Sequence, residues 1–314
     1  MTLDNFFQIW INDIRTTVKP NTIRTYRCAY KNHIAAELGS HELATINHTD
    51  IINARTVISQ SVSAGYTNYV ITVLKMLLEE ALRREIIDKN PAGSIRSIKV
   101  IQKSPHTTHR ALTVEEQQRF MFQIKEKKYY NLIALLLCTG LRFGEAGALR
   151  WTDIDFTRGV ISVNRTISYD ESCHTIIEKT PKSQASVREI PINSTIRGIL
   201  LSQKELTYGL GKDKNPDNLV FLSGKNTHPE NRSVNRFISK AVSEINASGF
   251  EMEKFTCHAL RDTFATRYIE QGGTMQTLKT ILGHSSITLT MDLYSHVLPD
   301  IRKKEMDMIS IDIG

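Results

Sequence analysis

The chain has 314 residues, of which 40% are hydrophobic and 23% charged, and its formal net charge is +7. This length suits about two domains, and the composition is that of an ordinary globular protein. The basic balance favours a polyanionic partner such as nucleic acid, although the same charge also aids solubility.

Cysteine usage and hydropathy exclude secreted and membrane-spanning proteins. The N-terminal segment has Asp4 early and lacks a long apolar core, so no signal peptide is expected. The apolar run at 131–141 is shorter than the roughly 20 residues that span a bilayer, which predicts a buried helix. We therefore expect a cytoplasmic protein without a membrane partner. The cysteines show no CxxC pair, which indicates reduced thiols: Cys28, Cys138, Cys173 and Cys257.

Residues 1–95 are predicted to form an N-terminal helical domain. Apolar residues recur there at helical spacing in four segments, with Pro20 near the start of the second and Thr49 as the cap of the third. The fourth helix is expected from about Tyr66 to Arg84. The expected inward residues are Leu3, Phe6, Phe7, Trp10 and Ile14, then Ile23, Tyr26, Tyr30 and Ile34, then Ile51, Ile52 and Val57, and finally Val70, Leu74, Leu77, Leu78 and Ala81.

Two further features of this half concern DNA and domain organisation. The outer face of the second helix carries Arg24, Arg27 and Lys31, which is either a DNA-facing surface or a solvated one. Residues 96–109 lose the apolar stripes and are rich in Ser, Lys and His, which predicts a linker.

Residues 110–314 are predicted to form a second, mixed domain. Thr113 and Glu116 make a capping box, and Gly140 ends a later helix just before Arg142. Short strands are expected at 160–163, 175–177 and 187–192, and helices at 194–203 and 231–245. The fold class is therefore mainly α with a small antiparallel β-sheet. Two arginines of the helix at 231–245, Arg232 and Arg236, are candidates for contact with a DNA backbone.

A set of five residues suits attack on a phosphodiester. Two guanidinium groups can clamp the non-bridging oxygens and stabilise the charge of the transition state. A tyrosine supplies an oxygen nucleophile, and histidines move protons near neutral pH. Metal-ligand spacing of Asp and Glu is absent from the sequence, so the arginines would replace a metal ion. The set consists of Arg142, His258, Arg261, His284 and Tyr294.

The motifs around these residues resemble the tyrosine recombinases, the phage integrase family. HALR at 258–261, LGHSS at 282–286 and TMDLYSHV at 290–297 are similar to the family's C-terminal signature. TGLRFGEAGALRWTDID at 139–155 resembles its first box, and PKSQASVREIPI at 181–192 resembles the hairpin that carries its catalytic lysine.

The resemblance implies a site-specific DNA recombinase. Tyr294 would form a 3′-phosphotyrosyl intermediate, with Lys182 as general acid and Lys179 as its rival for that role. Glu145 would orient an arginine or the neighbouring backbone. The N-terminal bundle corresponds to the family's SAM-like core-binding domain, and residues 110–314 to its catalytic domain.

Partners and cofactors also follow from the resemblance. The expected partners are double-stranded DNA recombination sites, bound by a homo-tetramer on two sites, with accessory DNA-bending or directionality proteins as further candidates. Neither a cofactor nor a metal is expected. Because the first bundle begins near residue 3, we expect no additional arm-site-binding domain. The tail after Asp300 either packs on a neighbouring subunit or frays.

Three other interpretations of these residues are a topoisomerase, a DNA-binding protein without catalysis and a zinc protein. Relaxation of DNA without partner exchange uses the same chemistry, as in type IB topoisomerases. A DNA-binding protein that has lost catalysis would keep the fold, but the intact residue set argues against it. Zinc binding by His258, His284 and His296 is disfavoured, because HExxH, CxxC and carboxylate partners at ligand spacing do not occur.

Overall fold

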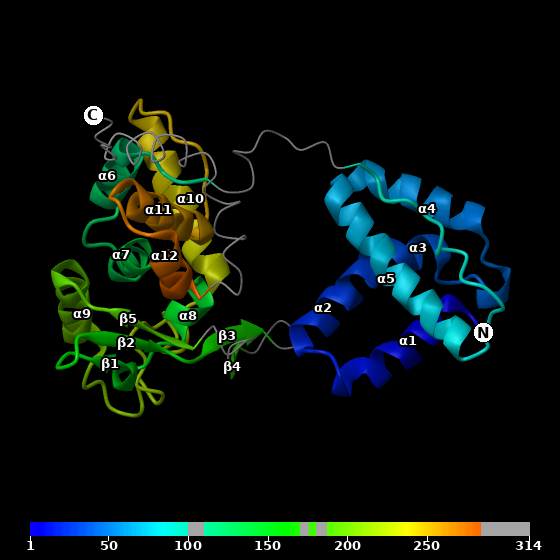
Figure 1. Ribbon diagram of the computed structural model, residues 1–314, viewed down its shortest axis with the longest axis horizontal. Helices are drawn as coiled ribbons and strands as arrows, with labels where there is room; N and C mark the ends of the chain where they lie inside the picture. Colours follow the sequence, from blue (N-terminus) through cyan, green and yellow to red (C-terminus); the bar gives the residue numbers. More distant parts are fainter. Residues whose placement is uncertain (100–109, 170–175, 180–186, 284–314) are drawn as a thin grey trace, which may run out of the picture. The chain divides into compact units, whose positions relative to one another are not determined.

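The computed structural model describes residues 1–99, 110–169, 176–179 and 187–283. The chain divides into two compact units (Figure 1). Among the described residues, 1–99 form the bulk of one unit, and 110–168, 177–179 and 187–283 form the other. Each unit has its own buried apolar core.

The first unit is a helical bundle (Figure 1). Its long helix α5 packs against α1, α2 and α4. A π-helical turn at Tyr30–Ile34 joins α2 to α3, and 3-10 turns cover Ile14–Thr16 and Leu43–Thr45. The α-helices are α1 (Leu3–Asp13), α2 (Pro20–Ala29), α3 (Ala35–Leu38), α4 (His48–Ser61) and α5 (Ala64–Arg83).

The apolar stripes read from the sequence make this core, with two corrections in α4. Val57 is 46% exposed, and the inward positions of this helix are Ile51, Ala54 and Ile58. The cap of this helix is Asn47, two residues before the expected cap Thr49. Asn47 accepts hydrogen bonds from the backbone of Thr49 and Asp50, while the Asp50 carboxylate accepts one from the backbone of Asn47. Reciprocal bonding of this kind satisfies the first amides of a helix better than a lone threonine does.

The chain that leaves the bundle is held to it by side chains of α4 and α5. The Asn68 amide pairs with both backbone groups of Ile98, at 2.9 and 2.8 Å. Arg55 donates to the carbonyl of Arg96 and Lys75 to that of Ile95. The first part of the predicted linker is therefore hydrogen-bonded to the first unit, and residues 100–109 lie outside the described chain.

The second unit combines helices with two small sheets. Strands β1, β2 and β5 form an antiparallel sheet in that order, and β3 pairs with β4. The register places Ile161 opposite both Ile154 and Ile190. The strands are β1 (Ile154–Asp155), β2 (Val160–Val163), β3 (Thr166–Tyr169), β4 (Ile176–Lys179) and β5 (Arg188–Pro191). The helices are α6 (Val114–Gln123), α7 (Tyr130–Thr139), α8 (Phe143–Gly147), α9 (Ser194–Thr207), α10 (Asn231–Ala247), α11 (Cys257–Glu270) and α12 (Met275–Leu282), with a 3-10 turn at Trp151–Asp153.

Helix α7 is the centre of the second unit. It packs against α9 and α11, and its residues Leu132, Ile133, Leu135 and Leu136 are buried. A helix that is apolar on all sides must be covered on all sides. The apolar run that is too short to cross a bilayer is thus the central core helix, as predicted.

A smaller apolar cluster joins α11 to α12. Ala265 and Ile269 of α11 pack with Leu278 and Leu282 of α12, and Phe264 and Tyr268 cover them. The apolar side of α11 therefore faces α12, which ends at Gly283 with a left-handed φ of 65°. The observed fold confirms the predicted class, a mostly helical chain with a small antiparallel sheet.

Candidate active site

The structure describes some of the predicted catalytic residues and not others. Arg142, His258 and Arg261, with the supporting Glu145, lie within it. The predicted Lys182, His284 and Tyr294 lie outside the described residues, and the rival Lys179 is the last residue of β4.

Helix α11 carries His258 and Arg261 one turn apart, on one face of the helix. Arg261 is buried, with 3% of its surface exposed. Its Nη1 donates to the carbonyl of Gly140 at 2.6 Å, and its Nη2 donates to the carbonyl of Leu282 at 2.8 Å. One permanently charged side chain therefore joins α11 to the turn after α7 and to the end of α12.

The turn after α7 requires glycine. Gly140 caps the helix with φ of 64°, in the left-handed region that side chains avoid. A Cβ atom at this position would lie 2.5 Å from the ring of Phe264 and 2.7 Å from the side chain of Leu282. This turn places Arg142, at the start of α8, close to Arg261 of α11, since both reach the carbonyl of Leu282.

Arg142 occupies the cap position of α8, as its sequence context predicts. Its backbone amide donates to Oε2 of Glu145 and its Nη1 to Oε1, both at 2.9 Å. The same Nη1 lies 3.4 Å from the carbonyl oxygen of Leu282. Because 42% of its side chain is exposed, Arg142 is accessible to a bound anion.

Glu145 is buried between two arginines. Arg188 of β5 donates through Nη1 and Nη2 to its two oxygens, at 3.2 and 2.9 Å. Burial favours the protonated acid, but the hydrogen bonds and positive charge of Arg188, with those of Arg142, outweigh it. The pKa of Glu145 is consequently lowered from its usual value, and the residue is a carboxylate at neutral pH.

Three arginines converge on the last two carbonyl groups of α12. Arg261 and Arg142 donate to that of Leu282, and Nε of Arg188 donates to that of Ile281. Carbonyls in the last turn of a helix have no partner within the helix and carry partial negative charge. The end of α12 therefore stabilises three neighbouring positive charges, and the carboxylate of Glu145 bonds two of these arginines.

His258 lies in the first turn of α11 with 58% of its side chain exposed. Its Nε2 is 3.9 Å from Oδ1 of Asp262, a carboxylate that is itself buried. An exposed imidazole next to a fixed carboxylate is suited to hold or move a proton for a bound ligand.

The residues predicted to contact DNA lie on the surfaces of α2 and α10. Arg24 and Arg27 are partly exposed on α2, and Nε of Arg24 donates to Oδ1 of Asn21 at 3.1 Å. Lys31, in the following π-helical turn, is exposed. Arg232 and Arg236 are exposed one turn apart on α10.

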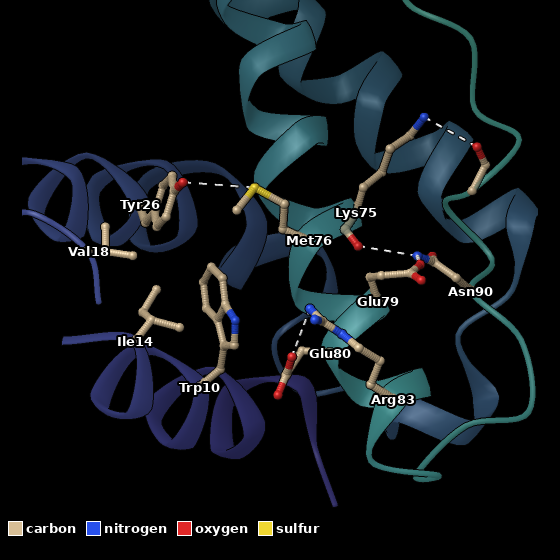
Figure 2. Close-up of a pocket in the computed structure, with 11 residues that line it drawn as sticks. Trp10, Ile14, Val18, Tyr26, Lys75, Met76, Glu79, Glu80, Arg83 and Asn90 are labelled. Atoms are coloured by element: carbon tan, nitrogen blue, oxygen red, sulfur yellow. Dashed lines mark hydrogen bonds and ion pairs between the residues drawn. The ribbon is translucent and has the colours of Figure 1, made fainter. Parts of the chain in front are cut away.

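A pocket of about 560 Å³ lies in the first unit, between α1, α2 and α5 (Figure 2). Trp10 and Ile14 line one side and Tyr26 and Met76 another, with the Tyr26 hydroxyl 3.9 Å from the Met76 sulfur. Of the predicted catalytic residues within the described ranges, none lines this pocket. It is a feature of the bundle and is separate from the arginine cluster.

Two absences concern the described ranges alone. Among residues 1–99, 110–169, 176–179 and 187–283, no group of three or more His, Cys, Asp or Glu residues could hold a metal ion. In the same part of the chain, no helix combines the length and hydropathy needed to cross a membrane.

Arg188 lies within the motif at 181–192, but its contacts were not predicted from the sequence. The sequence nevertheless contained a sign that Arg188 faces the core. In the predicted strand 187–192, Arg188 has the same parity as Ile190, so it faces the core with that residue. A charged residue on the inward side of a strand requires a buried partner, and Glu145 is that partner.

Comparison with known proteins identifies the class to which this fold and site belong. The phage integrase family matches residues 110–300, and the N-terminal SAM-like domain of phage integrases matches residues 2–57. The chain therefore belongs to the phage integrase family, and its enzyme class is that of the tyrosine recombinases and integrases.

Individual relatives match nearly the whole chain. A XerC-like tyrosine recombinase of Caldanaerobacter subterraneus subsp. tengcongensis is 28% identical, over 99% of this chain and 83% of that protein. The ICEBs1 integrase of Bacillus subtilis is 24% identical, over 98% of this chain and 83% of that protein.

Solved structures agree with this family assignment. The Tn1549 transposon integrase in complex with a circular intermediate DNA superposes with a TM-score of 0.81 at 25% identity, over 99% of this chain and all of that one. A lambda integrase dimer bound to a COC′ core site superposes with a TM-score of 0.70 at 20% identity, over 93% of this chain and 95% of that one. This similarity concerns the fold alone.

Proposed function

We propose that this chain cleaves and rejoins duplex DNA at specific sites, with Tyr294 as the nucleophile and a 3′-phosphotyrosyl bond as the intermediate. Its substrates would be double-stranded DNA recombination sites, bound and exchanged in the cytoplasm of a prokaryotic host. Family membership supports the enzyme class, and the DNA complex of the Tn1549 integrase supports the choice of substrate.

The observation that carries the proposal is the meeting of Arg142 and Arg261 at one carbonyl oxygen. Both donate to the carbonyl of Leu282, although they belong to different helices. Two guanidinium groups held this close offer paired N–H donors to an anion with several oxygens. A phosphodiester in its pentavalent transition state is such an anion, and fixed donors stabilise the charge that develops on it.

The proposed chemical steps rest on the family resemblance together with this arrangement. The Tyr294 oxygen forms a bond to phosphorus while the bond from phosphorus to the 5′ oxygen breaks. Lys182 gives a proton to that leaving oxygen, or Lys179 does if the hairpin register differs. Arg142 and Arg261 hold the non-bridging oxygens, and His258 and His284 assist them and move protons. The 5′-hydroxyl of a partner duplex then attacks phosphorus and releases the tyrosine.

This chemistry keeps the energy of the broken bond in the phosphotyrosine, so neither ATP nor a metal ion enters the balanced equation. The arginines supply the positive charge that a metal would otherwise provide. Glu145 supports the clamp by binding Arg142.

The remaining proposals concern DNA binding and assembly. Residues 1–95 would act as a core-binding domain, residues 96–109 as the linker and residues 110–314 as the catalytic domain. Arg24, Arg27, Lys31, Arg232 and Arg236 would contact phosphates, which position a protein on DNA without reading its sequence. A homo-tetramer on two DNA sites, with or without accessory DNA-bending proteins, rests on the family resemblance.

The test begins by finding the DNA site. Duplexes with a randomised segment are selected for binding to the Tyr294→Phe variant, which should bind without forming an adduct. Duplexes nicked at successive positions across the selected motif are then incubated with the wild-type chain, without metal or ATP. Protein–DNA adducts are scored on a denaturing gel, with Tyr294→Phe as the control.

We expect an adduct at one nick position that is absent from the Tyr294→Phe control. An adduct that persists in the control would overturn the role of Tyr294. Tight, sequence-selective binding without any adduct at any nick position would favour a DNA-binding protein without catalysis.

A further inference from the structure

We propose that Arg188 is a positioning residue: from strand β5 it holds Glu145, and through it Arg142, and also the carbonyl end of α12, in a single fixed arrangement. This inference rests on the proposed function, because it concerns the geometry of the phosphate clamp. Arg188 is not among the residues with a catalytic or supporting role in the function proposed above.

The contacts of Arg188 join three elements that are distant in the sequence. Nη1 and Nη2 donate to both oxygens of Glu145 in α8, at 3.2 and 2.9 Å, and Nε donates to the carbonyl of Ile281 in α12. The planar guanidinium fixes the directions of these bonds relative to one another. The distance and angle between α8 and the end of α12 are therefore set by one rigid group.

The two elements that Arg188 joins hold both arginines of the proposed clamp. Glu145 binds the backbone and the side chain of Arg142. The next carbonyl of α12, that of Leu282, accepts from Arg142 and Arg261. A displacement of either element would change the separation of the two clamp residues, so Arg188 controls that separation without touching the phosphate.

Burial indicates that this role is more than general stabilisation. Only 4% of the Arg188 side chain is exposed, as is 4% of its partner Glu145. Taking both charges out of water opposes most of the attraction between them, so a buried pair is a poor way to gain stability but an effective way to specify one geometry. In sequence, α12 leads directly into the segment that carries His284 and Tyr294.

An ion pair between Arg158 and Glu189, the residue that follows Arg188 in β5, provides a matched control. Arg158 donates through Nη1 and Nη2 to both oxygens of Glu189, at 3.0 and 2.9 Å. That pair has the same bidentate geometry, but its side chains are 61% and 47% exposed. Glu189 lies on the opposite side of β5 from Arg188, because side chains alternate along a strand. Replacing Arg158 by lysine makes the same chemical change where no clamp residue is attached.

The experiment compares wild type, Arg188→Lys, Arg158→Lys, Glu145→Gln and the double variant Arg188→Lys with Glu145→Gln. Lysine keeps the positive charge beside Glu145 but cannot reproduce the three fixed donor directions. DNA affinity and the single-turnover rate of adduct formation at saturating DNA are measured separately, on the nicked duplex identified above. Thermal unfolding shows that each variant is folded.

For Arg188→Lys we expect DNA affinity within about twofold of wild type and a cleavage rate lower by on the order of 10- to 100-fold, the loss expected for a displaced reacting group. Arg158→Lys should cleave at the wild-type rate. The double variant should be about as slow as the slower single variant, because both substitutions break the same connection.

Wild-type cleavage by Arg188→Lys would overturn the inference, and so would a double variant whose loss is the product of the two single losses. Absence of an adduct from the wild-type chain would instead count against the proposed function, so the two failures are distinct. If Arg188→Lys does not fold, the neutral pair Arg188→Met with Glu145→Met replaces it, since apolar replacement of a buried ion pair is often tolerated. That pair should bind DNA and cleave slowly, and wild-type cleavage by it would equally refute the role.

Discussion

At the scale of single residues, the site depends on side chains whose charge is fixed by their neighbours. Arg261 is permanently charged and buried, and it is stable there because the carbonyls of Gly140 and Leu282 accept from it. Glu145 is buried and ionised because Arg188 and Arg142 surround it. Substitutions at these positions separate the contribution of charge from that of geometry.

Arg261→Lys should abolish most cleavage while sparing DNA binding. A lysine keeps one positive charge but cannot hold two carbonyls and an anion with a planar fork. Loss of one fixed donor to a transition state slows reactions by on the order of 100-fold or more. Single-turnover adduct formation measures the loss, and a normal rate in this variant would contradict the clamp role.

The effect of Glu145 on stability should depend on pH. Its pKa is lowered in the folded chain relative to about 4.3 for an unfolded glutamate. The unfolded state therefore binds the proton first, and the stabilisation is fully present above the unfolded pKa and is lost as the pH falls through the folded pKa.

We therefore expect Glu145→Gln to lower the free energy of unfolding by about 3 kcal/mol at neutral pH, as when a buried ion pair is broken. The difference from wild type should shrink below about pH 4. Denaturant unfolding of both proteins over a pH series measures it. A difference that stays constant down to the acid limit of folding would show that Glu145 is not ionised in the folded chain.

At the scale of elements, the turn between α7 and α8 and the cap of α4 each make their own contribution to the free energy of unfolding. Both depend on local geometry that a single substitution changes, and each has a residue at the same kind of site that serves as a control.

Gly140→Ala should destabilise the chain more than Gly159→Ala. Both glycines have left-handed φ angles, 64° and 68°, so both substitutions introduce backbone strain of about 1 kcal/mol. Only at Gly140 would the new Cβ meet Phe264 and Leu282, whereas nothing lies within 4 Å at Gly159. Melting temperatures of the two variants give the comparison, and equal losses would show that α11 and α12 shift to accept the methyl group.

Asn47→Ala should lower the free energy of unfolding by about 1 kcal/mol, the usual contribution of a helix cap. Thr49→Ala should have little effect, because the Thr49 side chain makes no cap contact and its backbone amide bonds to Asn47. Urea denaturation of the two variants distinguishes the observed cap from the one that the sequence suggested. A larger loss for Thr49→Ala would reverse the assignment.

The contrast between Asn47 and Thr49 shows how far sequence patterns reach. Repeating apolar residues predicted α1, α5 and α7 because burial dominates those helices. The cap of α4 depended on a choice between two nearby polar residues, which periodicity does not make. Arg142 and Arg261 were recognised from motifs, but their meeting at the Leu282 carbonyl is a contact between segments distant in the sequence, which motifs do not specify.

At the scale of the whole molecule, function depends on a basic chain engaging a polyanion. The net charge of +7, the partly exposed arginines of α2 and the exposed arginines of α10 predict binding that is dominated by phosphate contacts. We expect affinity for the selected duplex to fall steeply and linearly with salt on logarithmic axes, through release of counterions. Arg232→Gln with Arg236→Gln should reduce that slope, and a flat salt response in the wild type would argue against a DNA ligand.

The two arginines of the proposed clamp are both held before a ligand binds, but by different groups. Arg261 is buried and donates to two carbonyls at 2.6 and 2.8 Å, whereas the 42% exposed side chain of Arg142 donates to Glu145 at 2.9 Å. Binding a phosphate would therefore restrict few additional rotamers of either side chain. An unrestrained arginine would lose up to about 2 kcal/mol of side-chain conformational entropy on being ordered. Most of that entropy is lost when the chain folds, and not when the DNA binds.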